Sequence, residues 1–135
     1  MRALLDADIL LDVALKREPF FASSAAVTQW AEDSPGQAAV AWHSLSNIAY
    51  LVRPDARPFL EHLLRFVDVP SVGTEEAKKA LGFPMPDIED ALQAAAALAI
   101  NADCIVSRNL RHYRHSPVPA RSPSQFLKEI GEPHT

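Results

Sequence analysis

The sequence predicts a single α/β domain built around a mostly parallel central sheet. Short apolar segments alternate with longer amphipathic segments along the whole chain, which is typical of strands that alternate with helices. The apolar segment 3–5 ends abruptly at Asp6, and the apolar segment 103–106 ends in polar residues. A chain of 135 residues can bury one hydrophobic core, so residues 1–135 are expected to form one domain.

The composition excludes several classes of protein. The single cysteine excludes a disulfide framework and argues against a thiolate zinc site. No signal peptide is visible and no apolar stretch is long enough to span a membrane, so a cytoplasmic location without membrane attachment is expected. The net charge of −4 gives no general attraction to nucleic acid. However, residues 104–128 contain four arginines and one lysine but no acid, which indicates either a basic rim beside an acidic pocket or a solvated loop.

The strands are predicted from short apolar or β-branched segments. They are residues 3–5, 37–42, 67–70 and 103–106, with a short edge strand at 117–119, where prolines are tolerated. The amphipathic segments between them predict helices over residues 8–16, 19–32, 44–53, 57–66, 74–81, 88–100 and 122–129. Ser44 and Thr74 are expected to cap two of these helices. The apolar side chains expected on inner helix faces include Leu11, Leu15, Phe20, Val27, Ile48, Leu51, Leu63, Leu64, Ile88, Leu92, Ala95 and Leu98.

Three acids are candidates for a catalytic site. Asp6 is expected at the carboxyl end of the first strand, which is where open α/β sheets bind their ligands. Asp87 and Asp90 begin the most regular helix and lie three residues apart, so they share one face. The alternative is purely structural, because aspartate is also a good helix cap, and this applies to Asp6, Asp8 and Asp87.

Polar residues after other strands are expected to join Asp6. If the fourth strand lies beside the first, Ser107 and Asn109 reach the same edge of the sheet. Asn47, near the start of the helix after the second strand, would lie there too. Asn109 could equally be a turn residue, and Asn47 an ordinary first-turn helix residue. Gathered carboxylates repel each other unless a cation neutralises them, and oxygen ligands of this kind suit Mg²⁺ or Mn²⁺.

Four segments of the chain resemble those of PIN-domain proteins, in the same order. They are LLDADILLDVALKREPF, WHSLSNIAYLV, PDIEDALQAAAALAINADCIVSRN and SPVPARSPSQFL. The resemblance covers nearly the whole chain and is strongest to small bacterial PIN proteins, many of which are toxins of VapC type. It implies a three-layer α/β/α fold with a sheet of about five strands. It also implies a Mg²⁺- or Mn²⁺-dependent endoribonuclease, a cognate antitoxin partner and a homodimer.

The resemblance also assigns roles to individual residues. Asp6, Asp87 and Asp90 become the metal ligands, and Asn109 joins them as a catalytic residue. The residues expected to support the site are Asp8, Asn47 and Ser107. Independently of the resemblance, Arg108 and Arg111 of the basic segment are expected to bind RNA phosphates. Asp12 is expected to lie behind the site or at the surface.

The sequence departs from the family pattern at several positions. Asn47 and Asn109 stand where many members carry acids, and Ala7 replaces a threonine. His112-Tyr113 stands where this branch often has Asp-Phe. The alternative function is therefore a PIN-like module that binds RNA or protein with little or no catalysis. A phosphatase of the haloacid dehalogenase type is disfavoured, because Ser107 follows Asp87 and Asp90 instead of preceding them.

Overall fold

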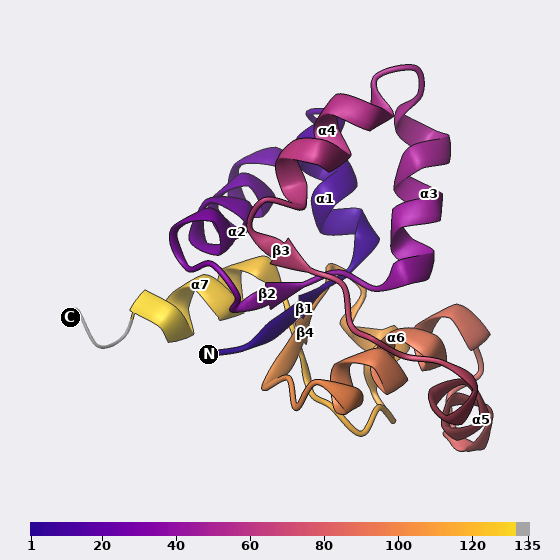
Figure 1. Ribbon diagram of the computed structural model, residues 1–135. Helices are drawn as coiled ribbons and strands as arrows, with labels where there is room; N and C mark the ends of the chain where they lie inside the picture. Colours follow the sequence, from indigo (N-terminus) through magenta and orange to yellow (C-terminus); the bar gives the residue numbers. More distant parts are fainter. Residues whose placement is uncertain (132–135) are drawn as a thin grey trace.

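The computed structural model, which describes residues 1–131, confirms an α/β domain of three layers (Figure 1). Its strands are β1 (Ala3–Leu5), β2 (Ala38–Ala39), β3 (Val67–Asp68), β4 (Cys104–Val106) and β5 (Ala120–Arg121). Its helices are α1 (Ala7–Ala14), α2 (Phe21–Asp33), α3 (Trp42–Val52), α4 (Ala56–Leu63), α5 (Thr74–Gly82), α6 (Ile88–Ala99) and α7 (Pro123–Gly131), with a 3₁₀ helix η1 (Leu110–Tyr113). Within residues 1–131, no helix is both long and apolar enough to cross a membrane.

All five strands run parallel, in the order β3-β2-β1-β4-β5. The first strand therefore lies in the middle of the sheet, with β4 as its neighbour. Leu5 is in register with Val106, and the backbone N–H of Asp6 donates to the Val106 carbonyl at 2.9 Å. This pairing confirms the expected neighbours and carries Asp6 and Ser107 to the same edge of the sheet.

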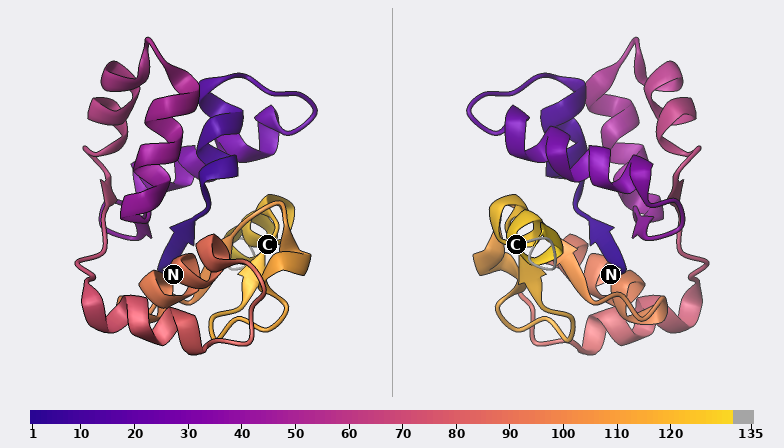
Figure 2. Two further views of the ribbon diagram at one scale, coloured as in Figure 1. Left: turned by 90° about the vertical axis from the view of Figure 1, so that its right-hand side faces the viewer. Right: turned by 90° about the vertical axis from the view of Figure 1, so that its left-hand side faces the viewer.

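Alternate residues of the central strands supply two separate cores. Ala3 and Leu5 pack toward α1 to α4 and α7, whereas Leu4 packs toward α5 and α6. The same alternation holds in β4, where Ile105 joins Leu4. Side views show α1 to α4 as one layer and α5 with α6 as the other, with the sheet between them (Figure 2).

The buried face of α6 differs from the predicted stripe. Ile88 and Leu98 are exposed, while the face that carries Ala94 and Ala97 is fully buried. These small side chains let the helix lie close to Leu4 of the central strand, in one core cluster. The side chains of this face are thus small because the sheet lies against them.

Two predicted strands have different bounds in the structure. The predicted strand 37–42 shortens to two residues, because Ala41 is already the N-cap of α3 and the chain turns helical at Trp42. Trp42 is 73% exposed, which fits the start of a helix better than a buried strand. The edge strand lies at Ala120–Arg121 instead of 117–119, because two of those three residues are prolines without an N–H to donate.

The predictions for several inner-face residues and for two helix caps were wrong. Leu15, Phe20, Leu51 and Leu64 are exposed, as are Ile88 and Leu98. Leu15 and Leu64 are helix C-caps, where the chain leaves the helical path and the apolar spacing no longer applies. Gly73, not Thr74, precedes α5, and its N–H donates to Glu76 Oε1 at 2.7 Å. Ser44 is buried in the first turn of α3 and is not its cap.

The sheet is expected to dominate stability. Leu4 is fully buried in the central strand, so Leu4→Ala should lower the free energy of unfolding by about 3 kcal/mol through lost apolar burial and a residual cavity. Leu81, which is 70% exposed, is the matched control, and Leu81→Ala should cost less than about 0.5 kcal/mol. Urea denaturation measures both values, and equal losses would contradict the proposed core.

Candidate functional site

Asp6 follows β1 and is held by three side chains from elements distant in the sequence. Its Oδ1 accepts a hydrogen bond from Gln93 Nε2 of α6 at 3.1 Å. Its Oδ2 accepts from Ser107 Oγ at 2.8 Å, just after β4, and from the Tyr113 hydroxyl of η1 at 3.2 Å. The structure thus brings Ser107 to Asp6 as the sequence predicted. These three hydrogen bonds, from three separate elements, fix the orientation of the carboxylate.

Asp8 lies in the first turn of α1 and contacts the segment after β4. Its Oδ2 accepts from Asn109 Nδ2 at 3.1 Å and from the backbone N–H of Arg108 at 3.3 Å. Its Oδ1 is buried and has no hydrogen-bond donor among the described residues. Burial, followed by the negative charge of Asp6, raises the pKa of Asp8 to about 7. Asn109 is therefore a partner of Asp8, not a direct neighbour of Asp6.

Asp90 lies in the first turn of α6, with its side chain only 15% exposed. Burial, followed by the charge of Asp87, raises the pKa of Asp90. His112 Nδ1 comes within 3.2 Å of its Oδ2, but without hydrogen-bond geometry, so that oxygen has no donor among residues 1–131. Asp87 is exposed and caps the helix, because its Oδ1 accepts from the Asp90 N–H at 3.1 Å. The capping alternative for Asp87 is thus confirmed.

The arrangement of acids fits a hard divalent cation, although it does not form a complete site. Within residues 1–131, no three histidine, cysteine, aspartate or glutamate side chains are grouped as a metal centre. Two buried carboxylate oxygens nevertheless lack donors, Asp8 Oδ1 and Asp90 Oδ2. The charge of Asp6 raises the pKa of both residues, so the three carboxylates are close enough to repel. A cation among oxygen ligands would relieve that repulsion.

A basic wall faces Asp87 and Asp90 across a cavity of about 430 Å³. The residues that line this cavity are Met85, Pro86, Asp87, Asp90, Arg111, His112, Arg114 and His115. The cations come from η1 and the turn after it, and the acids come from α6. This is the basic rim beside an acidic pocket that the charge distribution predicted.

Arg108 has a different environment from the one predicted. Its guanidinium donates from Nε to Asp12 Oδ2 at 2.8 Å and from Nη2 to Asp12 Oδ1 at 3.2 Å. The same group lies over the Phe20 ring, 3.8 Å from its centroid. Because these contacts occupy the guanidinium, the structure does not support the expectation that Arg108 binds RNA phosphates. Arg111, by contrast, faces the cavity.

The structure also adds residues that sequence reasoning missed. Gln93 is buried and links Asp6 to Ser44, whose Oγ lies 3.4 Å from Gln93 Oε1. Its sequence signal was a lone amide on an alanine-rich helix face. Asn47, expected at the site, is half-buried in α3 and makes no side-chain hydrogen bond to a described residue. Ser44, one turn earlier, is the α3 residue that reaches the site.

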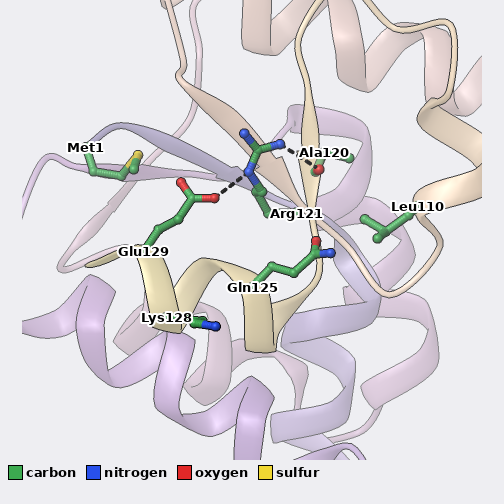
Figure 3. Close-up of a pocket in the computed structure, with 7 residues that line it drawn as sticks. All are labelled: Met1, Leu110, Ala120, Arg121, Gln125, Lys128 and Glu129. Atoms are coloured by element: carbon green, nitrogen blue, oxygen red, sulfur yellow. Dashed lines mark hydrogen bonds and ion pairs between the residues drawn. The ribbon is translucent and has the colours of Figure 1, made fainter. Parts of the chain in front are cut away.

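A larger cavity, of about 680 Å³, lies away from these acids (Figure 3). It lies beside β5 and α7, and Arg121 pairs with Glu129 across it. Neither residue is buried, and the arginine also donates to the Ala120 carbonyl at 3.1 Å. Size alone does not make this cavity the functional site, because its one carboxylate, Glu129, is already paired with Arg121.

Comparisons with known proteins agree with this fold. A family model described as PIN domain matches residues 2–111. One similar structure is VapBC2 from Rickettsia felis, which was solved bound to a DNA fragment from the VapBC2 promoter. One of its chains has a TM-score of 0.68 and 15% identity, over 90% of this chain and 98% of that one. A chain of a toxin–antitoxin complex from Klebsiella pneumoniae has a TM-score of 0.67 and 17% identity, over 90% of this chain and 97% of that one. A chain of VapBC-1 from nontypeable Haemophilus influenzae has a TM-score of 0.61 and 12% identity, over 92% of this chain and 99% of that one. No curated protein matches the sequence.

The raised pKa of Asp8 predicts a pH-dependent stability in metal-free protein. The folded state holds this proton up to about pH 7, whereas the pKa of a free aspartate carboxyl is 3.8. The favourable contribution is therefore complete below pH 4 and is lost as pH rises toward and through 7. Asp8→Asn should flatten the fall in unfolding free energy over this window, as measured by urea denaturation in EDTA. Unchanged steepness in the variant would show that Asp8 titrates normally.

Proposed function

The chain belongs to the PIN-domain family, and we propose that it is a metal-dependent endoribonuclease of VapC type, the toxin of a toxin–antitoxin pair. The observation that carries this proposal is the cluster of Asp6, Asp8 and Asp90. Asp6 and Asp8 lie at the end of β1 and the start of α1, whereas Asp90 comes from α6. The charge of Asp6 raises the pKa of both Asp8 and Asp90, and one buried oxygen of each has no donor among the described residues. A protein that needed only stability would gain by replacing such acids.

Asp6 and Asp90 would hold Mg²⁺ or Mn²⁺, with Asp8 as a third carboxylate. Asp87 was the third ligand expected from the sequence, but its Oδ1 caps α6, so its part in metal binding is secondary in this proposal. When bound, the ion stabilises the negative charge that develops on a phosphodiester under attack by water. An ion of this kind keeps several of its own water ligands, so few protein carboxylates suffice.

The neutral side chains around the acids fix their orientation. Ser107, Tyr113 and Gln93 donate to Asp6, and Asn109 donates to Asp8. Partners of this kind direct a carboxylate toward the metal, and their loss typically costs 10 to 100-fold in affinity or activity. Asn109, predicted as catalytic from its position, would therefore act by orienting Asp8.

RNA would enter along the basic wall. Arg111, Arg114 and His115 line the cavity opposite Asp87 and Asp90, and this charge can attract phosphates despite the net charge of −4. A phosphodiester held there would lie beside the acid cluster. We assign the phosphate contact to Arg111 and not to Arg108, whose guanidinium is bound to Asp12.

The proposed partners are an antitoxin and a second copy of the chain, in the cytoplasm. The similar solved structures include toxin–antitoxin complexes, which supports an antitoxin partner. Exposed apolar side chains supply a surface for association, among them Trp42, Tyr50 and Leu51 of α3. A gene for a small antitoxin directly upstream would support the first proposal, and sedimentation would test the second.

The competing function is a PIN-like module that binds RNA or a protein without efficient catalysis. Two observations favour it: asparagines at positions 47 and 109, and the lack of a complete metal cluster in the described chain. Both functions share the fold and the basic wall, so binding assays do not separate them. Cleavage does.

Asp6→Asn and Asp90→Asn should each lower RNA cleavage in Mn²⁺ by at least about 100-fold, because each removes a charge that would hold the metal. Asp55→Asn is the matched control, since Asp55 is exposed and makes no side-chain cap contact, and it should retain wild-type activity. Gel-resolved cleavage of labelled RNA with Mg²⁺, Mn²⁺ or EDTA is the measurement. Cleavage in EDTA, or full activity in both site variants, would refute the catalytic proposal and favour the binding module.

Arg111→Gln should weaken RNA binding and reduce the salt dependence of that binding by about one phosphate contact. The control is Arg65→Gln, which removes the same charge from an exposed position on the chain segment after α4. Fluorescence anisotropy with labelled single-stranded RNA at several salt concentrations gives both slopes. Identical slopes for the two variants would exclude a specific role for the basic wall.

A further inference from the structure

We propose that Asp12 is a positioning residue of the candidate site, acting through Arg108. It would fix residues 107–109, the segment that places Ser107 against Asp6 and Asn109 against Asp8. The consequence for metal affinity rests on the function proposed above, whereas the consequence for the geometry of the segment does not.

Asp12 is unusual because it is a fully buried carboxylate and each of its two oxygens accepts two hydrogen bonds. Its relative exposure is 0%, among the apolar residues of α1. Oδ2 accepts from Arg108 Nε at 2.8 Å and Ser24 Oγ at 2.9 Å, and Oδ1 accepts from Arg17 Nε at 3.1 Å and Arg108 Nη2 at 3.2 Å. Its donors thus come from α2, from the turn after α1, and from the segment after β4.

The two bonds to Arg108 have the fork geometry that fixes both the position and the plane of a guanidinium. The Phe20 ring covers one face of the guanidinium, and the Arg108 side chain is only 24% exposed. Phe20 belongs to the chain just before α2, so the guanidinium is held between two elements. The prediction that Phe20 lies in the core failed for this reason: its ring covers an arginine.

Arg108 lies between the two residues that orient the acids. Its own N–H donates to Asp8 Oδ2 at 3.3 Å, Ser107 Oγ donates to Asp6, and Asn109 Nδ2 donates to Asp8. The N–H of Asn109 also donates to Ser107 Oγ at 3.0 Å, which links the two side chains. A change in the Arg108 side chain would therefore move donors on both Asp6 and Asp8.

A role in stability alone explains Asp12 poorly. A buried ion pair is often no more stabilising than apolar residues of the same volume, because both charges lose their hydration. What the pair does supply is a fixed geometry. It joins α1, which carries Asp8 and Asp12, to the segment after β4, so the donors and the acids that they orient are held by one network.

The test compares three variants of the full chain. Asp12→Asn keeps the shape of the side chain but removes its charge, and Arg108→Lys keeps the charge but loses the fork. Ser24→Ala is the matched control, because it removes a donor at 2.9 Å from the same Asp12 oxygen without touching Arg108. ¹⁵N NMR of metal-free protein follows the Ser107 amide and the Asn109 side-chain amide, and calorimetry with MnCl₂ alone gives the metal affinity.

Asp12→Asn and Arg108→Lys should shift the Ser107 and Asn109 signals and weaken Mn²⁺ binding about 10-fold or more. Ser24→Ala should leave both at wild-type values. If Asp12→Asn does not fold, Arg108→Lys decides the question. Unchanged signals in the variants, or an equal shift in Ser24→Ala, would overturn the positioning role. If the wild type binds no Mn²⁺, the metal-dependent function fails, and the NMR signals alone decide whether Asp12 positions the segment.

Discussion

The parallel pairing of β1 with β4 is the constraint on which the candidate site depends. Because Leu5 is in register with Val106, the residues after both strands leave the sheet together at one edge. Asp6 and Ser107 meet there at 2.8 Å. The small side chains of α6 let that helix approach the same strands, which brings in Gln93 and Asp90. A shift of one residue in this register would separate every one of these contacts.

The four acids near this edge are stabilised in different ways. Asp12 is neutralised by Arg17 and Arg108, and Asp6 is held by three neutral donors. Asp8 and Asp90 each keep a buried oxygen without a donor and have raised pKa values. Of these two, Asp90 lines the cavity beside the basic wall, and Asp8 lies at the start of α1 next to Asp6. This uneven distribution of counter-charges is what a cation-binding edge requires.

Local patterns in the sequence predicted the fold well but predicted side-chain partners less well. The strand β1, the contact of Asp6 with Ser107 and the basic rim followed from apolar segments and charge spacing. Gln93 and Tyr113 were missed because hydrogen bonds across more than 80 residues leave no periodic signal. The pairing of Arg108 with Asp12 could not be predicted either, because a free and a paired arginine look alike in sequence. The predictions of buried helix faces failed mainly at helix ends, where the 3.6-residue period no longer applies.

The residues that depart from the family pattern reduce the repulsion within the cluster. The histidine at position 112 lowers the pKa of Asp90, whereas an aspartate at this position would raise it. The hydroxyl of Tyr113 gives Asp6 a donor that phenylalanine could not supply. Asn109 donates to Asp8 instead of adding another charge. Since less repulsion leaves less free energy for a cation to recover, we expect this site to tolerate the metal-free state well and to bind divalent ions more weakly than a fully acidic one.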